Sequence, residues 1–260
     1  MKVILNFMKN GGFSIFLWCS ILVFLTGISL AAETDKLAQA DAALQSPTLD
    51  QTQARTALEL YESLLSAGGD EARVLERLTR VCFILGDMTE DPDQRREYYE
   101  KGRTYADQLL AAQPQGAAGH YWLAMNLCGE ADACGALVGR KLLPRILEEL
   151  HQALDLDQVY DRAGAHRVLG RIYFEAPGWP LSVGNMEKSL EHLTKAVQLA
   201  PEVSTNHLYL AETLIRLGKY DQARQELEAT LQAPRHAIQP GGLAEDRRRA
   251  RQLLKELEGK

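Results

Sequence analysis

Residues 206–227 read NHLYLAETLIRLGKYDQARQEL, and this stretch decides the fold. Its apolar residues recur every three or four positions, which is the spacing of one face of an α-helix. Gly218 and Lys219 interrupt this pattern and indicate a tight turn. Ala211 and Ala223 are small enough to let two helices approach closely where they cross, and leucines on both sides fill the remaining space. The stretch therefore predicts a helical hairpin.

The same hairpin pattern recurs upstream in weaker form. Its anchor leucines are spaced by 45, 46 and 41 residues, at Leu78, Leu123, Leu169 and Leu210. A short helix with one apolar stripe cannot bury that stripe alone, so successive hairpins must stack. No alternation of β-branched residues is long enough to predict a strand. We predict an all-α fold of stacked antiparallel hairpins, a tetratricopeptide-like α-solenoid.

The intervals exceed the ~34 residues of the tetratricopeptide repeat, so they predict inserted loops, which often carry function. These loops are expected at residues 86–93, 128–140 and 175–185. The repeat domain is predicted to span residues 33–242. Residues 243–260 are predicted to form a capping helix, because leucines occupy one face and three arginines the other.

The first 32 residues have the pattern of an export signal. Two lysines precede a long apolar run without charge, and small residues follow it. We predict cleavage after Ala31 or Ala32 and a periplasmic protein. The alternative is an uncleaved anchor, since the apolar run approaches the ~17 residues that a spanning helix needs.

Charge and motifs exclude several function classes. The formal net charge is -6, which argues against a nucleic-acid partner. The sequence contains no zinc-protease motif, no glycine-rich phosphate loop and no serine elbow. We therefore predict a binding protein with no catalytic residue, cofactor or metal, and an enzyme is the weakest of the alternatives.

Cysteines raise one question about redox chemistry. Cys128 and Cys134 flank a polar segment that we interpret as a loop, and in an oxidising compartment they could close it as a disulfide. Two shielded free thiols are the equal alternative. Cys82 lies in an apolar helical segment and is predicted to be a core residue.

The loop at residues 175–185 reads EAPGWPLSVGN and is the least generic segment of the chain. Pro177 and Pro180 restrict the backbone, so the loop is expected to be stiff and to hold Trp179 in one place. A fixed aromatic side chain suits an apolar ligand or a partner surface. The alternative is that Trp179 seals the hairpin core.

Four further polar or aromatic residues are candidates for binding. His166, Arg167 and Tyr173 belong to the helix before this loop and are expected to lie near one groove. Arg167 suits an anionic group, although an arginine here more often pairs with a neighbouring carboxylate. Asn206 begins the next hairpin and suits a backbone amide, although a helix cap explains it equally well.

Several segments together resemble a known family. They are YWLA at 121–124, LDLD at 154–157, HRVLGRIY at 166–173, APGWPLSVG at 176–184 and NHLYLAE at 206–212. With them the chain is similar to the T component of tripartite ATP-independent periplasmic (TRAP) transporters. That resemblance implies tetratricopeptide-like hairpins, homo-oligomers, a solute-binding protein as partner, and a groove for an apolar or organic-acid ligand. The chain lacks the lipid-attachment cysteine of that family.

Two functions follow from these patterns. The first is a non-enzymatic periplasmic accessory that docks the solute-binding component of a transporter. The alternative is a general cell-envelope scaffold that grips peptides or assembly partners in its concave surface.

Overall fold

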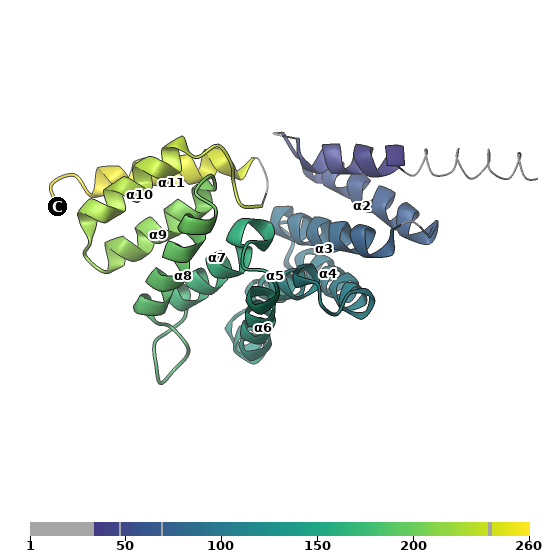
Figure 1. Ribbon diagram of the computed structural model, residues 1–260, viewed down its shortest axis with the longest axis horizontal. Helices are drawn as coiled ribbons and strands as arrows, with labels where there is room; N and C mark the ends of the chain where they lie inside the picture. Colours follow the sequence, from purple (N-terminus) through teal and green to yellow (C-terminus); the bar gives the residue numbers. More distant parts are fainter. Residues whose placement is uncertain (1–33, 47, 69, 239–240) are drawn as a thin grey trace, which may run out of the picture.

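The computed structural model describes residues 34–46, 48–68, 70–238 and 241–260, and most of this part of the chain is helical (Figure 1). Residues 34–44 are helical. The elements that follow are α2 (Gln51–Ser66), α3 (Glu71–Met88), α4 (Pro92–Ala112), α5 (Ala117–Cys134), α6 (Ala136–Leu156), α7 (Tyr160–Glu175), α8 (Met186–Leu199), α9 (Ser204–Arg216), α10 (Tyr220–Gln232) and α11 (Gly242–Glu256). The predicted signal sequence at 1–32 lies outside the described residues.

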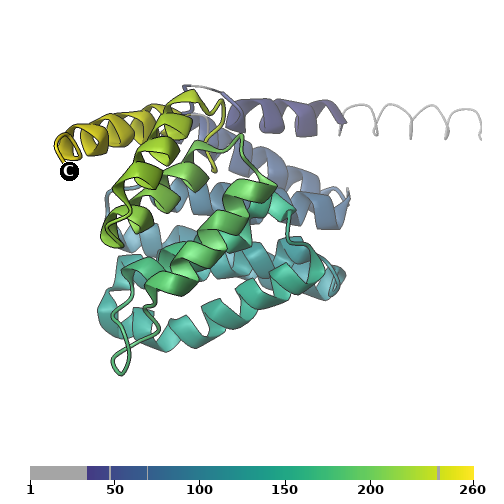
Figure 2. The ribbon, with the colours of Figure 1, turned by 60° about the vertical axis from the view of Figure 1, so that its left-hand side comes forward.

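Neighbouring helices pack as antiparallel hairpins, and the hairpins stack along the chain (Figure 2). Helices α3, α5, α7 and α9 also contact one another in that order, so they form an inner layer. Helices α4, α6, α8 and α10 each pack on this inner layer. The predicted fold class, an all-α stack of tetratricopeptide-like hairpins, is confirmed.

The hairpin of α9 and α10 forms as its sequence predicts. Ala211 and Ala223 are fully buried where the helices cross, and Leu227 is also fully buried. Gly218 adopts a φ of 71°, which a residue with a side chain rarely takes, so glycine is required at this turn. Pattern and turn chemistry thus select the same local structure.

The region at 128–140 is not a loop, and the disulfide prediction is wrong. Helix α5 continues to Cys134 and α6 begins at Ala136. Cys128 and Cys134 are free thiols on the same helix. Six residues of α-helix separate two Cα atoms by about 9 Å along the axis, beyond the ~7 Å that a disulfide spans. The alternative of two free thiols is therefore the correct one.

Glycines that resemble helix breakers serve packing instead. A Cβ atom on Gly86 would lie 2.5 Å from the Tyr99 ring, and one on Gly129 would overlap the same ring. The helices therefore run through both glycines so that Tyr99 can pack between them, and α3 extends to Met88. The loop predicted at 86–93 shortens to the few residues before Pro92.

Helix α11 packs against α9 and α10 at the C-terminal end of the stack. Ala250, Leu253 and Leu257 are buried in the same core cluster as Leu210 and Leu214. This is the apolar face expected of a capping helix, whereas the boundary at residue 242 stays a prediction. Among the described residues, no helix combines the length and apolarity needed to cross a membrane.

Candidate functional site

A groove lies along the inner layer of helices. It encloses a cavity of about 550 Å³ between α3, α4, α5, α7 and α9, and residues 236–238 close one side of it. Its apolar lining consists of Phe83, Tyr99, Met125, Val168, Ile172, Tyr209, Ala237 and Ile238. Its charged lining consists of Asp87, Arg95, Asp132, Arg167, Arg171 and Glu175. Such a mixture suits a ligand that is partly apolar and partly charged, as a peptide segment is.

The charges at the rim of the groove are already paired. Arg95 donates to Asp132 across 2.9 Å. Arg171 donates to Glu175 and Glu212, each across 2.5 Å, and its guanidinium lies 4.5 Å from the centroid of the Tyr209 ring. Paired side chains have fixed positions, so the rim is stiff before any ligand arrives.

Asp87 is a carboxyl of the groove whose titration is shifted by its surroundings. Burial raises the pKa of this carboxyl, and nearby Arg95 offsets only part of the effect. A carboxyl with a raised pKa takes up a proton at a higher pH than an ordinary aspartate does, and it can then donate a hydrogen bond. Proton-linked binding in the groove would therefore involve Asp87.

Arg167 reaches the groove but belongs to a buried polar network. Its side chain is 3% exposed and donates to the Asp161 carboxylate across 3.0 Å. It also donates to Asn206 Oδ1 and to Tyr121 Oη, each across 3.2 Å. Arg167 therefore pairs with a neighbouring carboxylate, which was the alternative to binding an anionic ligand. The pair is buried rather than on the surface.

Asn206 is likewise committed within the fold. Its side-chain amide is fully buried and donates to the carbonyls of Ala196 and Ala200, both across 3.2 Å. The structure thus brings Arg167 and Asn206 together, but their polar groups face each other and the backbone rather than a ligand. Their role is to join α7 to the end of α8.

His166 and Tyr173 do not line the groove. His166 Nδ1 lies 3.0 Å from His192 Nδ1, and the Tyr173 ring stacks on His192 with centroids 5.6 Å apart. Burial, and then the nearby His192 and Lys195, lower the pKa of His166 to about 4. The expected single groove for His166, Arg167 and Tyr173 is wrong, because consecutive residues of a helix point about 100° apart.

Trp179 and Pro180 lie on the loop between α7 and α8, which projects from the stack (Figures 1 and 2). Trp179 is 89% exposed and Leu181 is 69% exposed, so the alternative that Trp179 seals the core is wrong. The loop is nevertheless tied down. Gly184 N donates to the Pro177 carbonyl across 2.9 Å, and Asn185 N donates to the Tyr173 carbonyl across 2.8 Å.

The loop also forms one wall of a shallow apolar surface. Pro180, Leu181 and Val183 face Leu143, Pro144 and Leu147 of α6 across it. Exposed apolar groups on an anchored loop are typical of a contact surface for a partner. The six predicted residues therefore divide between a buried network, a histidine pair and this exposed loop.

Sequence reasoning missed the groove residues of α3, α4 and α5. Phe83, Arg95 and Met125 carry no motif, and only packing of distant helices brings them together. The one available signal was the pair Gly86 and Gly129, whose small size admits Tyr99. Within the described part of the chain, no group of three or more metal-ligating side chains occurs.

Comparison with known proteins bears on this geometry. The model of the family described as "Regulator of microtubule dynamics protein 1-3" matches residues 36–180, which is more than half of the chain. The chain belongs to this family. Within this member of the regulator of microtubule dynamics family, residues 181–239 also match a tetratricopeptide repeat model. The first match covers most of the groove and the second covers α8 to α10.

Two curated relatives carry the name of this family, and a solved structure shares the fold. Regulator of microtubule dynamics protein 3 from Mus musculus is 27% identical over 210 residues, and the Rattus norvegicus protein is 27% identical over 209 residues. These matches cover 74% and 73% of this chain but 44% of each relative, so the chain spans less than half of their length. The crystal structure of a thermophilic tetratricopeptide protein from Thermus thermophilus has a TM-score of 0.62 at 20% identity, covering 85% of this chain and 99% of that chain.

These matches support a less specific function than the one that the resemblance to transporter T components implies. They assign a tetratricopeptide-type protein of the regulator of microtubule dynamics family, and such stacked repeats form extended concave surfaces that bind proteins. The similarity to transporter T components stays a prediction.

Proposed function

We propose that this protein is a non-enzymatic scaffold whose groove binds an extended segment of a partner protein. The single observation that carries the proposal is the cavity of about 550 Å³ on the inner helices, with an apolar floor and a rim of paired charges. An extended peptide offers alternating side chains for such a floor and backbone groups for such a rim. The mouse and rat relatives are named for the regulation of microtubule dynamics, and this chain spans less than half of their length.

Photo-crosslinking tests this proposal in cells that make the full chain. A photoreactive amino acid at Ile172, on the groove wall, is expected to capture a defined set of proteins. Val168→Glu places a charge one helical turn away on the same wall and is expected to reduce capture about tenfold or more. Val159→Glu is the matched control, since Val159 is 54% exposed and does not line the groove. Equal capture by the two variants would exclude the groove as the binding site.

A second candidate function is the periplasmic accessory of a TRAP-type transporter. The observation that favours it is Trp179, which is 89% exposed on the loop that carries the most specific part of the resemblance. In this proposal the exported protein docks the solute-binding component through the loop, and the groove takes an apolar or organic-acid ligand. Homo-oligomers through the same apolar surface are consistent with this arrangement.

A binding measurement with a purified solute-binding protein tests the second candidate. Trp179→Ala is expected to weaken binding about tenfold or more, as loss of an anchoring aromatic side chain does. Leu137→Ala is the control, because Leu137 is 80% exposed on α6 and does not line the loop surface. Failure of the unchanged chain to bind would remove this candidate and leave the groove proposal intact.

A further inference from the structure

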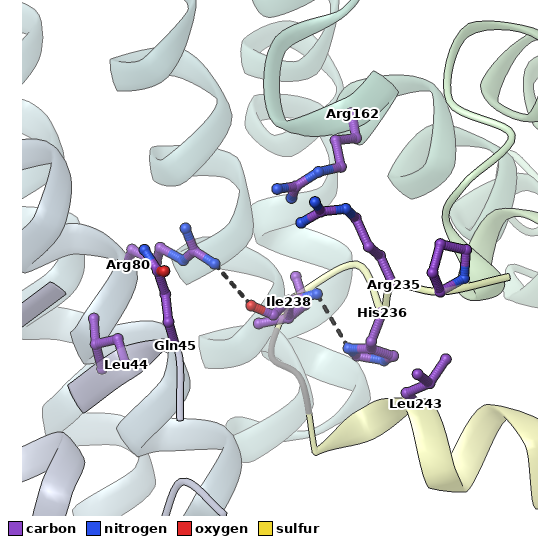
Figure 3. Close-up of a pocket in the computed structure, with 9 residues that line it drawn as sticks. Leu44, Gln45, Arg80, Arg162, Arg235, His236, Ile238 and Leu243 are labelled. Carbon is purple, nitrogen blue, oxygen red and sulfur yellow. Dashed lines mark hydrogen bonds between the residues drawn. The ribbon is translucent and has the colours of Figure 1, made fainter. Parts of the chain in front are cut away.

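A second cavity adjoins the groove at His236 and Ile238 and is lined by three arginines (Figure 3). It encloses about 350 Å³ where the helical residues 34–44 end beside α3, the start of α7 and the segment after α10. Arg80, Arg162 and Arg235 come from three different elements and converge on it. Leu44, Ile238 and Leu243 give it an apolar side.

These arginines lack the counter-charges that most arginines of this acidic chain have. No carboxylate lines the cavity, and none of the three forms an ion pair with any residue that the structure describes. Arg80 donates to the Ile238 carbonyl across 2.9 Å, and its buried Nε has no hydrogen-bond partner in the described part of the chain. Arg162 and Arg235 both line this cavity, and Figure 3 draws them with Arg80 around it. Like charges that line one small cavity repel each other, so an anion bound there would relieve the repulsion.

The carboxylates of an adjoining cavity have other partners. Glu76 and Asp161 line an adjoining cavity with Arg80 and Arg162. Glu76 accepts a hydrogen bond from Tyr160 across 2.6 Å, and Asp161 accepts from Tyr121 across 2.8 Å in addition to Arg167. Among the residues that the structure describes, neither carboxylate forms an ion pair with Arg80 or Arg162.

An unusual backbone segment sets the position of Arg162. Asp161, Arg162 and Ala163 have φ values of 46°, 54° and 60°, in the left-handed region. Left-handed conformation is unfavourable for any residue with a side chain, so three such residues in succession need external support. Arg167 supplies it by donating to the Arg162 carbonyl across 3.2 Å and to the Asp161 carboxylate. A strained segment that is held this firmly is typical of a functional site.

We propose that this cavity binds a phosphate monoester, with Arg80, Arg162 and Arg235 donating to the phosphate oxygens. A phosphate monoester carries close to two negative charges and three acceptor oxygens, which match three guanidinium groups better than a single carboxylate does. Its organic part lies against Leu44, Ile238 and Leu243. Arginine is suited to this task because its planar donors engage phosphate oxygens in pairs.

Isothermal titration of the full chain tests the proposal at low ionic strength, with inorganic phosphate and phenyl phosphate as separate probes. Both are expected to bind saturably with one site per chain, and phenyl phosphate is expected to bind more tightly because its ring is apolar like one side of the cavity. Arg162→Gln and Arg235→Gln are each expected to weaken binding about tenfold. Arg140→Gln removes the same charge from an exposed residue outside the cavity and is expected to leave binding within about twofold.

Three results would overturn the site. The first is that the unchanged chain shows no saturable binding of phosphate. The second is that Arg140→Gln and Arg235→Gln lose the same amount of phosphate affinity. The third is that succinate binds as tightly as phosphate. Arg235→Gln keeps the proposal testable if Arg162→Gln fails to fold. The backbone of Arg235 holds the segment through Glu202 and Ser204, and the side chain takes no part in those bonds. Circular dichroism of each variant confirms that the fold is retained.

Discussion

The two ends of α7 treat their conspicuous residues in opposite ways. At its start, Asp161 pairs with Arg167 from the middle of the helix. Arg167 is 3% exposed, and its other partners are Tyr121 and Asn206 inside the fold. Just beyond its end, Trp179 is 89% exposed on an anchored loop. A charged residue is thus structural and a large aromatic residue is free for contact, the reverse of what residue type alone suggests.

This difference shows that a side chain can bind a ligand or a partner only where the fold has not already used its polar or apolar groups. A buried arginine with a full set of partners has no donor left for a ligand, whatever its residue type. An exposed tryptophan on a fixed loop can bury a large apolar area against a partner with little loss of conformational freedom. We therefore expect the start of α7 to serve stability and its end to serve contact.

The largest expected effect comes from Arg167→Met. It leaves the Asp161 carboxylate, 8% exposed, without its charged partner and removes the support of the left-handed segment. Removing one member of a buried ion pair costs about 3–5 kcal/mol of unfolding free energy. Urea denaturation measures the loss. Asp161→Asn combined with Arg167→Met is expected to recover part of it, because no uncompensated charge remains buried.

A matched control isolates the buried network in this experiment. Arg140 is exposed, so Arg140→Met is expected to change the unfolding free energy by no more than about 0.5 kcal/mol. If Arg167→Met and Arg140→Met have the same stability, the buried network does not hold the turn, and the contrast between the two ends of α7 disappears.

The anchoring of the loop gives the next largest effect. A Cβ atom on Gly184 would overlap the Ala176 carbonyl oxygen, which is backbone and cannot move aside cheaply. Gly184→Ala is expected to cost about 1–3 kcal/mol of unfolding free energy, as overpacking does. Gly178→Ala is the control within the same loop, since its Cβ would meet nothing closer than 3.8 Å. Equal stability of the two variants would mean that the loop is not fixed by this contact.

The sequence predicts the hairpins well because local rules govern them. The spacing of apolar residues, Ala211 and Ala223 at the crossing, and Gly218 at the turn all act over one or two helical turns. The loop at 175–185 is also predicted correctly, because its two prolines cannot continue a helix. These features need no knowledge of distant residues.

The rest depends on contacts between residues far apart in the chain. Gly86 and Gly129 look like breakers until Tyr99 is seen to pack between them. Nothing in the sequence DRA at 161–163 signals a left-handed turn, because that turn is imposed by Arg167 and Tyr121. The groove and the arginine cavity are likewise assembled from separate elements, so single-sequence patterns cannot find them.

Acid is expected to act on the buried side of α7 and not on the loop. The pKa of His166 in the folded chain is about 4, against 6.5 for an ordinary histidine. Between these pH values the unfolded chain binds a proton that the folded chain does not bind, so stability falls as the pH falls from 6.5 to 4 and changes no further from this source below that. Above pH 6.5 His166 is neutral in both the folded and the unfolded chain, so it causes no loss of stability there.

His166→Gln is expected to flatten this pH dependence by on the order of 1 kcal/mol, allowing for the partial exposure of the ring. Urea denaturation at several pH values measures it in the unchanged chain and in the variant. His207, whose pKa is raised through hydrogen bonds to Glu226 and Pro201 against the opposing effect of burial, is present in both proteins and cancels from the difference. Parallel curves for the two proteins would show that His166 titrates normally.

The smallest expected effect on stability is that of Trp179→Ala. This variant distinguishes most directly between a structural role and a contact role for the loop after α7. Because the indole is 89% exposed, its removal is expected to change the unfolding free energy by no more than about 0.5 kcal/mol. A buried tryptophan would instead cost about 3–5 kcal/mol on truncation to alanine, so urea denaturation separates the two cases clearly. Leu181→Ala, at a neighbouring side chain that is 69% exposed, is expected to behave in the same way. A loss of several kcal/mol in Trp179→Ala alone would place the indole in the core, and the loop would then be one more structural element like the start of α7. Unchanged stability together with weaker partner binding would instead separate the two ends of α7 into one that maintains the fold and one that makes contact.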